Sequence, residues 1–194
     1  IYSRPGNQTA HARVTLDGMR LAPELRKFMQ YQPEIALLYA PSSILLEGKS
    51  YLAALQEIYM ALCFTGYRPR MITEQQLAAK DFGETKVVFA VGAKYISQSA
   101  LNGFAEFVRR GGRVITDSKS LLNNEFGQSV KCSFVTEKLC AVESETLLML
   151  IKKNITPLPV MLKCAHGEGN KGVFFRMIPD TDGSWLVNIV NYNK

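Results

Sequence analysis

Two short stretches, Ile35-Ala-Leu-Leu-Tyr-Ala40 and Lys86-Val-Val-Phe-Ala-Val91, decide the fold of this chain. Each is an almost unbroken apolar run, and such runs are typical of strands that are covered on both faces. Pro41 directly follows the first run and Gly92 follows the second, and both residue types interrupt regular structure. The sequence therefore predicts two central strands of a sheet with a layer of structure on each side.

Helical and strand patterns alternate around these two runs. After a loop that begins at Pro41, Ser50–Thr65 places apolar side chains along one helical stripe, and Gly66 indicates where this helix ends. The other elements expected here are a strand over Arg70–Thr73, a polar helical turn over Glu74–Ala79, a helix over Ser97–Arg110 that stops at Gly111-Gly112, and a strand over Arg113–Thr116. This alternation over residues 35–116 predicts parallel strands joined by right-handed crossovers.

The two ends of the chain show other patterns. Residues 19–29 place Leu21, Leu25 and Phe28 at helical spacing, which predicts a helix that leads into the sheet. Beyond residue 120 we expect a strand at Lys131–Val135, a helix at Glu143–Lys153, and β segments at Leu158–Cys164, Gly172–Pro179 and Ser184–Asn191. The last two β segments should form a hairpin, because the Asp-Gly pair in the turn 180–183 readily adopts positive φ.

The predicted fold class is α/β: an open parallel sheet flanked by helices, flavodoxin-like or like the class I glutamine amidotransferases, with a small C-terminal antiparallel β segment. We expect a linker and leading helix over 1–30, an amidotransferase-like α/β domain over 31–156, and a partial β-sandwich or β appendage over 157–194. The polar start at Ile1 has neither an initiator methionine nor the pattern of a signal peptide. We expect it to be a cut inside a longer polypeptide.

Composition narrows the classes of function. The formal net charge is +6, but the basic residues are scattered rather than gathered in a stripe, so we expect no nucleic-acid partner. We also expect no membrane partner, because the chain lacks an apolar run of about 18 residues. The four cysteines form no CxxC pair and have no metal-like spacing with the two histidines. We therefore predict no metal site, and reduced thiols that favour a cytoplasmic location.

Polar residues follow each predicted parallel strand, at the edge where open sheets of this kind bind ligands. The candidate ligand or interface site consists of Ser42, Ser43, Glu74, Gly92, Lys94, Tyr95, Asp117, Ser118 and Lys119, with Pro41, Thr73 and Ala93 beside them. The alternative interpretation is that these are turn and capping residues, since Ser and Asp commonly cap the helix that follows.

The sequence shows no complete catalytic centre. The turn over residues 41–48 lacks a Gly-x-Gly-x-x-Gly fingerprint, and no P-loop is present, so we expect no nucleotide cofactor or other cofactor. Residues 116–120 lack the glycines of a nucleophile elbow. Ser118 would act as a nucleophile only if a base reached it, and the histidines that could serve are His11 and His166. We therefore predict no catalytic residue in this chain.

Several segments resemble the family 42 β-galactosidases and their relatives. Residues 11–25 followed by 35–43 look like the exit from the catalytic barrel of those enzymes, where a linker helix leads into an amidotransferase-like central domain called the trimerisation domain. Phe107–Asp117 is similar to the helix-Gly-Gly-strand element of that domain, and Asp117–Gly127 resembles the loop that follows. The β segment over 158–191 looks like the start of their small C-terminal sandwich. Asp117-Ser-Lys-Ser120 departs from the family because it lacks the glycine usual in that loop.

The resemblance implies a non-catalytic domain of a bacterial carbohydrate-active glycoside hydrolase, serving oligomer assembly and shaping of the substrate cleft. Its partners would be the catalytic barrel of the same polypeptide and neighbouring subunits of a homo-oligomer, with carbohydrate as a further candidate. No catalytic residue carries over, because the catalytic glutamates of the family lie on the barrel. Two alternatives remain open. One is a self-contained amidotransferase-like or trehalose-utilisation-like hydrolase that uses Ser118 or a cysteine, and the other is a small-ligand binding module.

Overall fold

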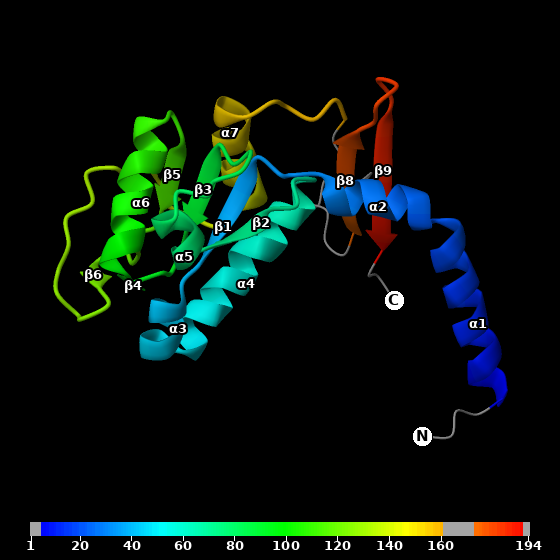
Figure 1. Ribbon diagram of the computed structural model, residues 1–194, viewed down its shortest axis with the longest axis horizontal. Coiled ribbons are helices and arrows are strands. Elements are labelled where there is room, and N and C mark those ends of the chain that lie inside the picture. The colour runs from blue at the N-terminus through cyan, green and yellow to red at the C-terminus, as the bar shows by residue number, and fades with distance from the viewer. Residues whose placement is uncertain (1–4, 161–172, 192–194) are drawn as a thin grey trace. The chain divides into compact units, whose positions relative to one another are not determined.

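The computed structural model describes residues 5–160 and 173–191 (Figure 1). The helices are α1 (Pro5–Arg20), α2 (Ala22–Gln30), α3 (Pro41–Glu47), α4 (Lys49–Phe64), α5 (Glu74–Ala78), α6 (Gln98–Arg109) and α7 (Ser144–Asn154). The strands are β1 (Ile35–Tyr39), β2 (Arg70–Thr73), β3 (Val87–Ala90), β4 (Tyr95–Ile96), β5 (Arg113–Thr116), β6 (Asn123–Asn124), β7 (Glu137–Lys138), β8 (Val173–Pro179) and β9 (Trp185–Asn191).

The chain folds as two compact units. The smaller unit comprises residues 1–31 and 178–186, and the larger unit comprises residues 32–177 and 187–194. In the smaller unit, Lys27 of α2 forms an ion pair with Asp180, with 2.6 Å between Nζ and Oδ2. The larger unit holds the parallel sheet.

The sheet of the larger unit is open and parallel. Its strand order is β2-β1-β3-β5-β7, and every neighbouring pair runs parallel. Counted along the chain within this sheet, the order is 2-1-3-4-5, which is the order of flavodoxin-like folds. A second, two-stranded parallel pair joins β4 to β6, and β8 pairs with β9. The predicted α/β class, with its parallel sheet and its small β pair at the end of the chain, is confirmed.

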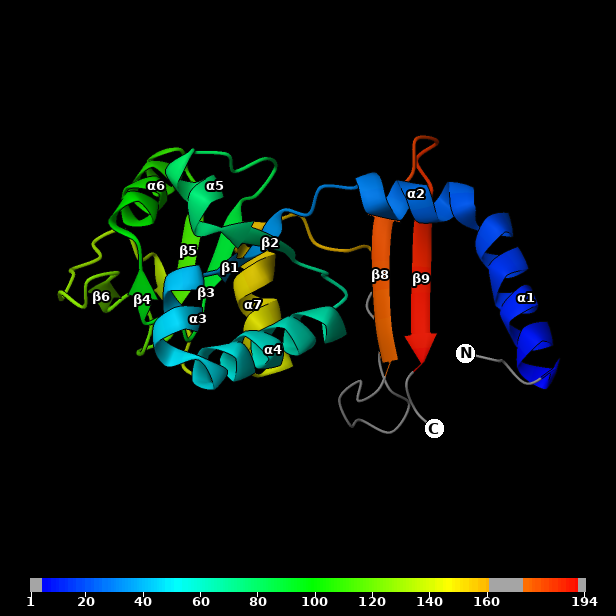
Figure 2. The ribbon, with the colours of Figure 1, turned by 60° about the horizontal axis from the view of Figure 1, so that its bottom comes forward.

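Helices cover both faces of the sheet (Figure 2). Helix α4 contacts α7 on one face, and α5 contacts α6 on the other. All four residues of β3 and the first four of β1 are buried, because these two strands lie in the middle of the sheet. The apolar runs that opened the sequence thus form the centre of the core.

Most elements inside residues 35–116 agree with the sequence patterns, and Arg70–Thr73 and Arg113–Thr116 match to the residue. The prediction of a loop after Pro41 was wrong, because Pro41–Glu47 form the helix α3. Pro41 is the first residue of this helix, where its missing N–H leaves no hydrogen bond unmade. The structure also contains α1, which the sequence patterns did not predict because its apolar residues form no stripe.

Beyond residue 120, one predicted strand was wrong and one lies partly outside the described residues. Lys131–Val135 is not a strand, and the edge strand of the sheet is β7, which begins two residues after Val135. Thr136 explains this shift, since its N–H and hydroxyl donate to the carbonyl of Val114 and bring the following residues against β5. In the predicted β segment Leu158–Cys164, residues 158–160 form no strand, and 161–164 fall outside the described residues.

None of the helices in residues 5–160 and 173–191 combines the length and apolar character needed to cross a lipid bilayer.

Candidate functional site

The carboxylate of Glu74 joins the segments that follow three strands: β1 and β2 of the five-stranded sheet, and β4 of the separate pair. Glu74 begins α5, directly after β2, and is only 6% exposed. Its Oε1 accepts a hydrogen bond from the N–H of Ser42 (3.0 Å), and its Oε2 accepts from the hydroxyl of the same serine (2.9 Å). Oε2 also accepts from the N–H of Ser97 (2.9 Å), which precedes α6. One side chain therefore ties the residues after β1, β2 and β4 together.

Two helix starts at this edge already hold carboxylates of the chain itself. The first N–H groups of a helix attract anions, because they lack partners within the helix and lie at the positive end of its dipole. Glu74 occupies this position for α3 through Ser42, and Glu125 does so for α6 by accepting from the N–H of Gln98 (2.7 Å). A phosphate or carboxylate ligand would need these same N–H groups. The carboxylates of Glu74 and Glu125 thus bind the helix N–H groups that a bound anion would otherwise bind.

Ser43 and Tyr95 fasten α3 to the segment after β3. The hydroxyl of Ser43 donates to the carbonyl of Tyr95 (2.7 Å) and accepts from the N–H of Tyr95 (2.9 Å). Ser43 is completely buried. Both capacities of its hydroxyl are used inside the protein, so Ser43 is a structural link rather than a free polar group.

Gly92 takes part in packing. Its φ of +70° is a left-handed value, and a Cβ added there would lie 2.6 Å from the Cβ of Ala54 on α4. The loop after β3 can therefore approach α4 only with glycine at this position.

Lys94 binds an acidic neighbour rather than pointing into an empty site. Its Nζ lies 3.2 Å from Oε1 of Glu47 and 5.2 Å from the ring centre of Tyr95. The hydrogen bond to Glu47, with the attraction of its charge, raises the pKa of Lys94 above its usual value. Lys94 therefore remains a cation that holds the end of α3.

The turn after β5 contains the remaining candidates. Asp117 Oδ1 accepts from the N–H of Lys119 (3.1 Å) and from the hydroxyl of Ser120. These contacts form a turn of the kind that Asp commonly stabilises. Ser118 and Lys119 are exposed. Asp117 thus acts within its own loop, whereas Ser42, Ser43, Glu74 and Tyr95 are linked across different elements.

Sequence reasoning missed the buried residue Tyr51 beneath this edge. Its hydroxyl donates to the carbonyl of Leu38 (2.6 Å) and accepts from the N–H of Ala40 (3.0 Å), so it holds the end of β1. Burial raises the pKa of Tyr51 to about 12. The sequence placed Tyr51 only on the apolar stripe of α4, and no local pattern distinguishes a tyrosine that binds the backbone from one that simply packs.

Thiol chemistry gains no support from the described cysteines. Burial raises the pKa of Cys63 and of Cys132, which lowers the fraction of reactive thiolate at neutral pH. Across residues 5–160 and 173–191, no group of three or more His, Cys, Asp or Glu side chains is placed to hold a metal ion. His11 lies on the exposed surface of α1, while His166 and Cys164 fall outside the described residues.

Solved structures share this fold. The apo GH42 exo-carrageenase from Bacteroides ovatus matches 91% of this chain with a TM-score of 0.69 and 19% identity. That match covers 25% of the carrageenase, so our chain spans about a quarter of its length. The β-galactosidase from Bifidobacterium adolescentis matches 51% of this chain and 46% of its own at 20% identity (TM-score 0.43). The β-galactosidase from the psychrophilic Marinomonas ef1 matches 63% of this chain and 19% of its own at 12% identity (TM-score 0.44).

No protein-family model matches the sequence, and no curated protein matches it either. At 19% identity, the match to the carrageenase shows a shared fold over nearly the whole chain.

Proposed function

We propose that this chain is a non-catalytic domain of a β-galactosidase-like glycoside hydrolase, where it serves oligomer assembly and helps shape the substrate cleft. The observation that carries the proposal is the extent of the structural match. It spans 91% of this chain but only a quarter of an exo-carrageenase, as expected for one domain of a larger enzyme. Fold alone does not specify function, so the proposal also needs support from the site.

The carboxyl edge of the sheet supports a structural role. Glu74 and Glu125 bind the N–H groups where a ligand would be held, and the hydroxyl of Ser43 is satisfied by Tyr95. Ser118 is the candidate nucleophile of the alternative hydrolase. Within residues 5–160 and 173–191, its hydroxyl forms no hydrogen bond to a histidine. These features favour an assembly domain over a self-contained enzyme or a ligand-binding module.

Exposed apolar side chains on α1 supply a candidate surface for assembly. Val14, Leu16 and Met19 are 72%, 65% and 70% exposed. Leu16 and Met19, three residues apart, lie on the same side of α1, whereas Val14 lies on the other side. Neighbouring exposed apolar side chains such as Leu16 and Met19 are typical of surfaces that pack against a partner. In the proposed function, α1 packs against the catalytic barrel or a neighbouring subunit.

Chromogenic galactosides test the catalytic part of the proposal. We expect the chain alone to leave them intact, and the longer polypeptide with a catalytic barrel to hydrolyse them. Hydrolysis by the chain alone, abolished by Ser118→Ala, would overturn the proposal in favour of the hydrolase.

The role in assembly is tested in the longer polypeptide with the double variant Leu16→Ser, Met19→Ser, which changes two neighbouring exposed side chains of α1. Sedimentation velocity should show a smaller assembly for this variant than for the unmodified enzyme. Gln8→Ser, an exposed polar position on the same helix, is the matched control and should leave the assembly unchanged. An unchanged assembly in the double variant would remove α1 from the proposed interface.

A further inference from the structure

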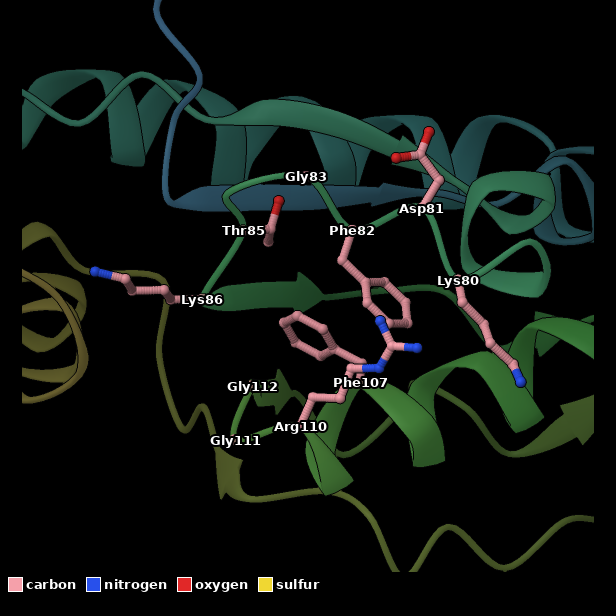
Figure 3. A pocket seen from close by; sticks show the side chains of 10 residues that line it. All are labelled: Lys80, Asp81, Phe82, Gly83, Thr85, Lys86, Phe107, Arg110, Gly111 and Gly112. Atoms are coloured by element: carbon pink, nitrogen blue, oxygen red, sulfur yellow. The ribbon is translucent and has the colours of Figure 1, made fainter.

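The amino edge of the sheet has a hollow that the chain fills with its own side chains (Figure 3). Phe82 and Phe107 pack edge to face there, and they are only 7% and 2% exposed. The guanidinium of Arg110 covers the ring of Phe82, with 5.4 Å between its Cζ and the ring centre, and a Cβ at Gly112 would lie 2.5 Å from the ring of Phe107. The hollow therefore offers no free face to a ligand, unlike the outer surface of α4.

Helix α4 has one side in the core and one side that is open to solvent (Figures 1 and 2). The side in the core consists of Tyr51, Leu55, Ile58 and Leu62. Helical periodicity places Ala53 directly opposite these residues, with Lys49 about one turn before it and Glu57 about one turn after it. Lys49, Ala53 and Glu57 are all exposed. They form a row that faces away from the sheet.

The two charges of this row are unpaired. Within the described ranges 5–160 and 173–191, neither Lys49 nor Glu57 forms an ion pair or a side-chain hydrogen bond. The two residues cannot pair with each other, because they lie about two helical turns apart, or about 12 Å along the axis. The row therefore has a free cation at one end and a free anion at the other.

Exposed apolar side chains border this row. Leu52 and Met60 of α4 are 44% and 37% exposed, and Leu45 and Leu46, at the end of α3 just before α4, are 85% and 55% exposed. Apolar side chains that are exposed together are typical of surfaces that become buried in an interface. The small side chain of Ala53, in the middle of the row, allows a second helix to approach closely, since the side chains at the contact set the distance between packed helices.

From this arrangement we propose that the outer face of α4 binds the same face of a second copy of this chain, with the two helices antiparallel about a two-fold axis near Ala53. Turning the helix end over end about Ala53 exchanges Lys49 with Glu57. Lys49 of each copy therefore pairs with Glu57 of the other copy, as a two-fold contact requires. Because the face complements itself in charge, it favours a second copy over an unrelated partner. This contact deepens the assembly role in the proposed function and rests on that role.

Sedimentation velocity of the full 194-residue chain over a range of concentrations tests this contact. We expect a reversible dimer whose dissociation constant rises at least about tenfold in Lys49→Glu and in Glu57→Lys, since either change places two pairs of like charges across the interface. Lys152→Glu makes the same change of charge at an exposed position of α7 and should alter the constant less than about twofold. A monomer at every concentration would overturn the proposal, as would an equal loss in Lys152→Glu.

Mixing the two charge variants separates the two-fold pairing from a loss of folding. When a Lys49→Glu copy meets a Glu57→Lys copy, both pairs across the interface again join opposite charges. We expect the mixture to form a heterodimer at least about tenfold more tightly than either variant associates with itself. No gain on mixing would overturn the pairing of Lys49 with Glu57. Failure here alongside the expected galactoside and α1 results would reject the α4 contact and leave the proposed function standing.

Discussion

At the scale of single residues, Glu74 bears the most contacts at the carboxyl edge of the sheet. Its carboxylate accepts three hydrogen bonds, two from Ser42 and one from Ser97. In Glu74→Gln, the amide nitrogen replaces one acceptor and leaves at least one of these donors unpaired. Since an unpaired buried group costs about 1–3 kcal/mol, we expect the free energy of unfolding in urea to fall by about that amount.

The matched control is Glu84→Gln, which changes an exposed glutamate whose side chain forms no hydrogen bond or ion pair within residues 5–160 and 173–191. It should alter the unfolding free energy by less than about 0.5 kcal/mol. Equal losses in the two variants would mean that charge, rather than the hydrogen bonds of Glu74, matters for stability.

The raised pKa of Tyr51 leads us to expect that the free energy of unfolding depends on pH in the alkaline range. Its pKa is raised from 10.0 to about 12 in the folded chain, so above pH 10 the unfolded chain loses this proton first. The unfolded state is then favoured, and the unfolding free energy falls as the pH rises from about 10 to about 12. By pH 11 the loss from this one group is about 1.4 kcal/mol relative to pH 9.

Comparison with Tyr51→Phe isolates this contribution from other groups that titrate at alkaline pH. The variant is less stable at pH 7 by about 1–3 kcal/mol, because the N–H of Ala40 and the carbonyl of Leu38 lose their partner. Urea titrations at pH 9 and pH 11 should show a smaller loss in the variant than in the unmodified chain. Identical losses would show that Tyr51 titrates normally.

At the scale of elements, α6 can approach α5 only because residue 103 is glycine. A Cβ added at Gly103 would lie 2.1 Å from the carbonyl oxygen of Leu77, which is backbone and cannot rotate away. Gly103→Ala should therefore separate α5 from α6 and lower the unfolding free energy by about 1–3 kcal/mol or more. Thermal or urea unfolding would measure this, with Asn102→Ala on the exposed face of α6 as the control. A neutral Gly103→Ala would show that the two helices move apart freely.

The element patterns explain which parts of the fold the sequence could predict. Arg113–Thr116 was located correctly because Gly111 and Gly112 form a helix stop: their N–H groups donate to the carbonyls of Val108 and Phe107, and Gly111 has a φ of +93°. The edge strand Glu137–Lys138 was missed because two polar residues carry no strand pattern. Its place depends on Thr136 binding Val114, which is a contact between distant parts of the chain.

The candidate site also contains one feature that the sequence could predict and one that it could not. Its positions were chosen from the topology, since parallel strands end at one edge, and the structure brings the candidates Ser42 and Glu74 together with Ser97, which was not among the predicted candidates. The sequence could not predict that Glu74 binds the N–H groups of Ser42 and Ser97. These hydrogen bonds depend on distances between segments that are far apart in the chain.

At the scale of the whole molecule, the two compact units differ in how much core they contain. In the described part of the smaller unit, the buried large apolar residues are Phe28 and Ile178, whereas the larger unit buries most of β1, all of β3 and one face of α6. Regions with few buried apolar contacts open more easily. We expect amides of α1 and α2 to exchange with deuterium at least about tenfold faster than those of β3.

Hydrogen exchange followed by mass spectrometry measures this difference, with α4 as the internal reference for a well-packed helix. Asp180→Asn should accelerate exchange in α2 further, because it removes the anionic partner of Lys27. Protection of α1 equal to that of β3 would show that the smaller unit gains stability from a source other than its own core.

The carboxylates of Glu74 and Glu125 have a consequence for protein engineering. A flavodoxin-like sheet is an attractive scaffold for new phosphate-binding sites, yet the usual strategy of adding cationic side chains would fail at this edge. The helix N–H groups are already engaged, and an incoming phosphate would meet two negative charges. Design of such a receptor should therefore begin by deletion, with Glu74→Ala and Glu125→Ala vacating both helix starts before any new side chain is introduced.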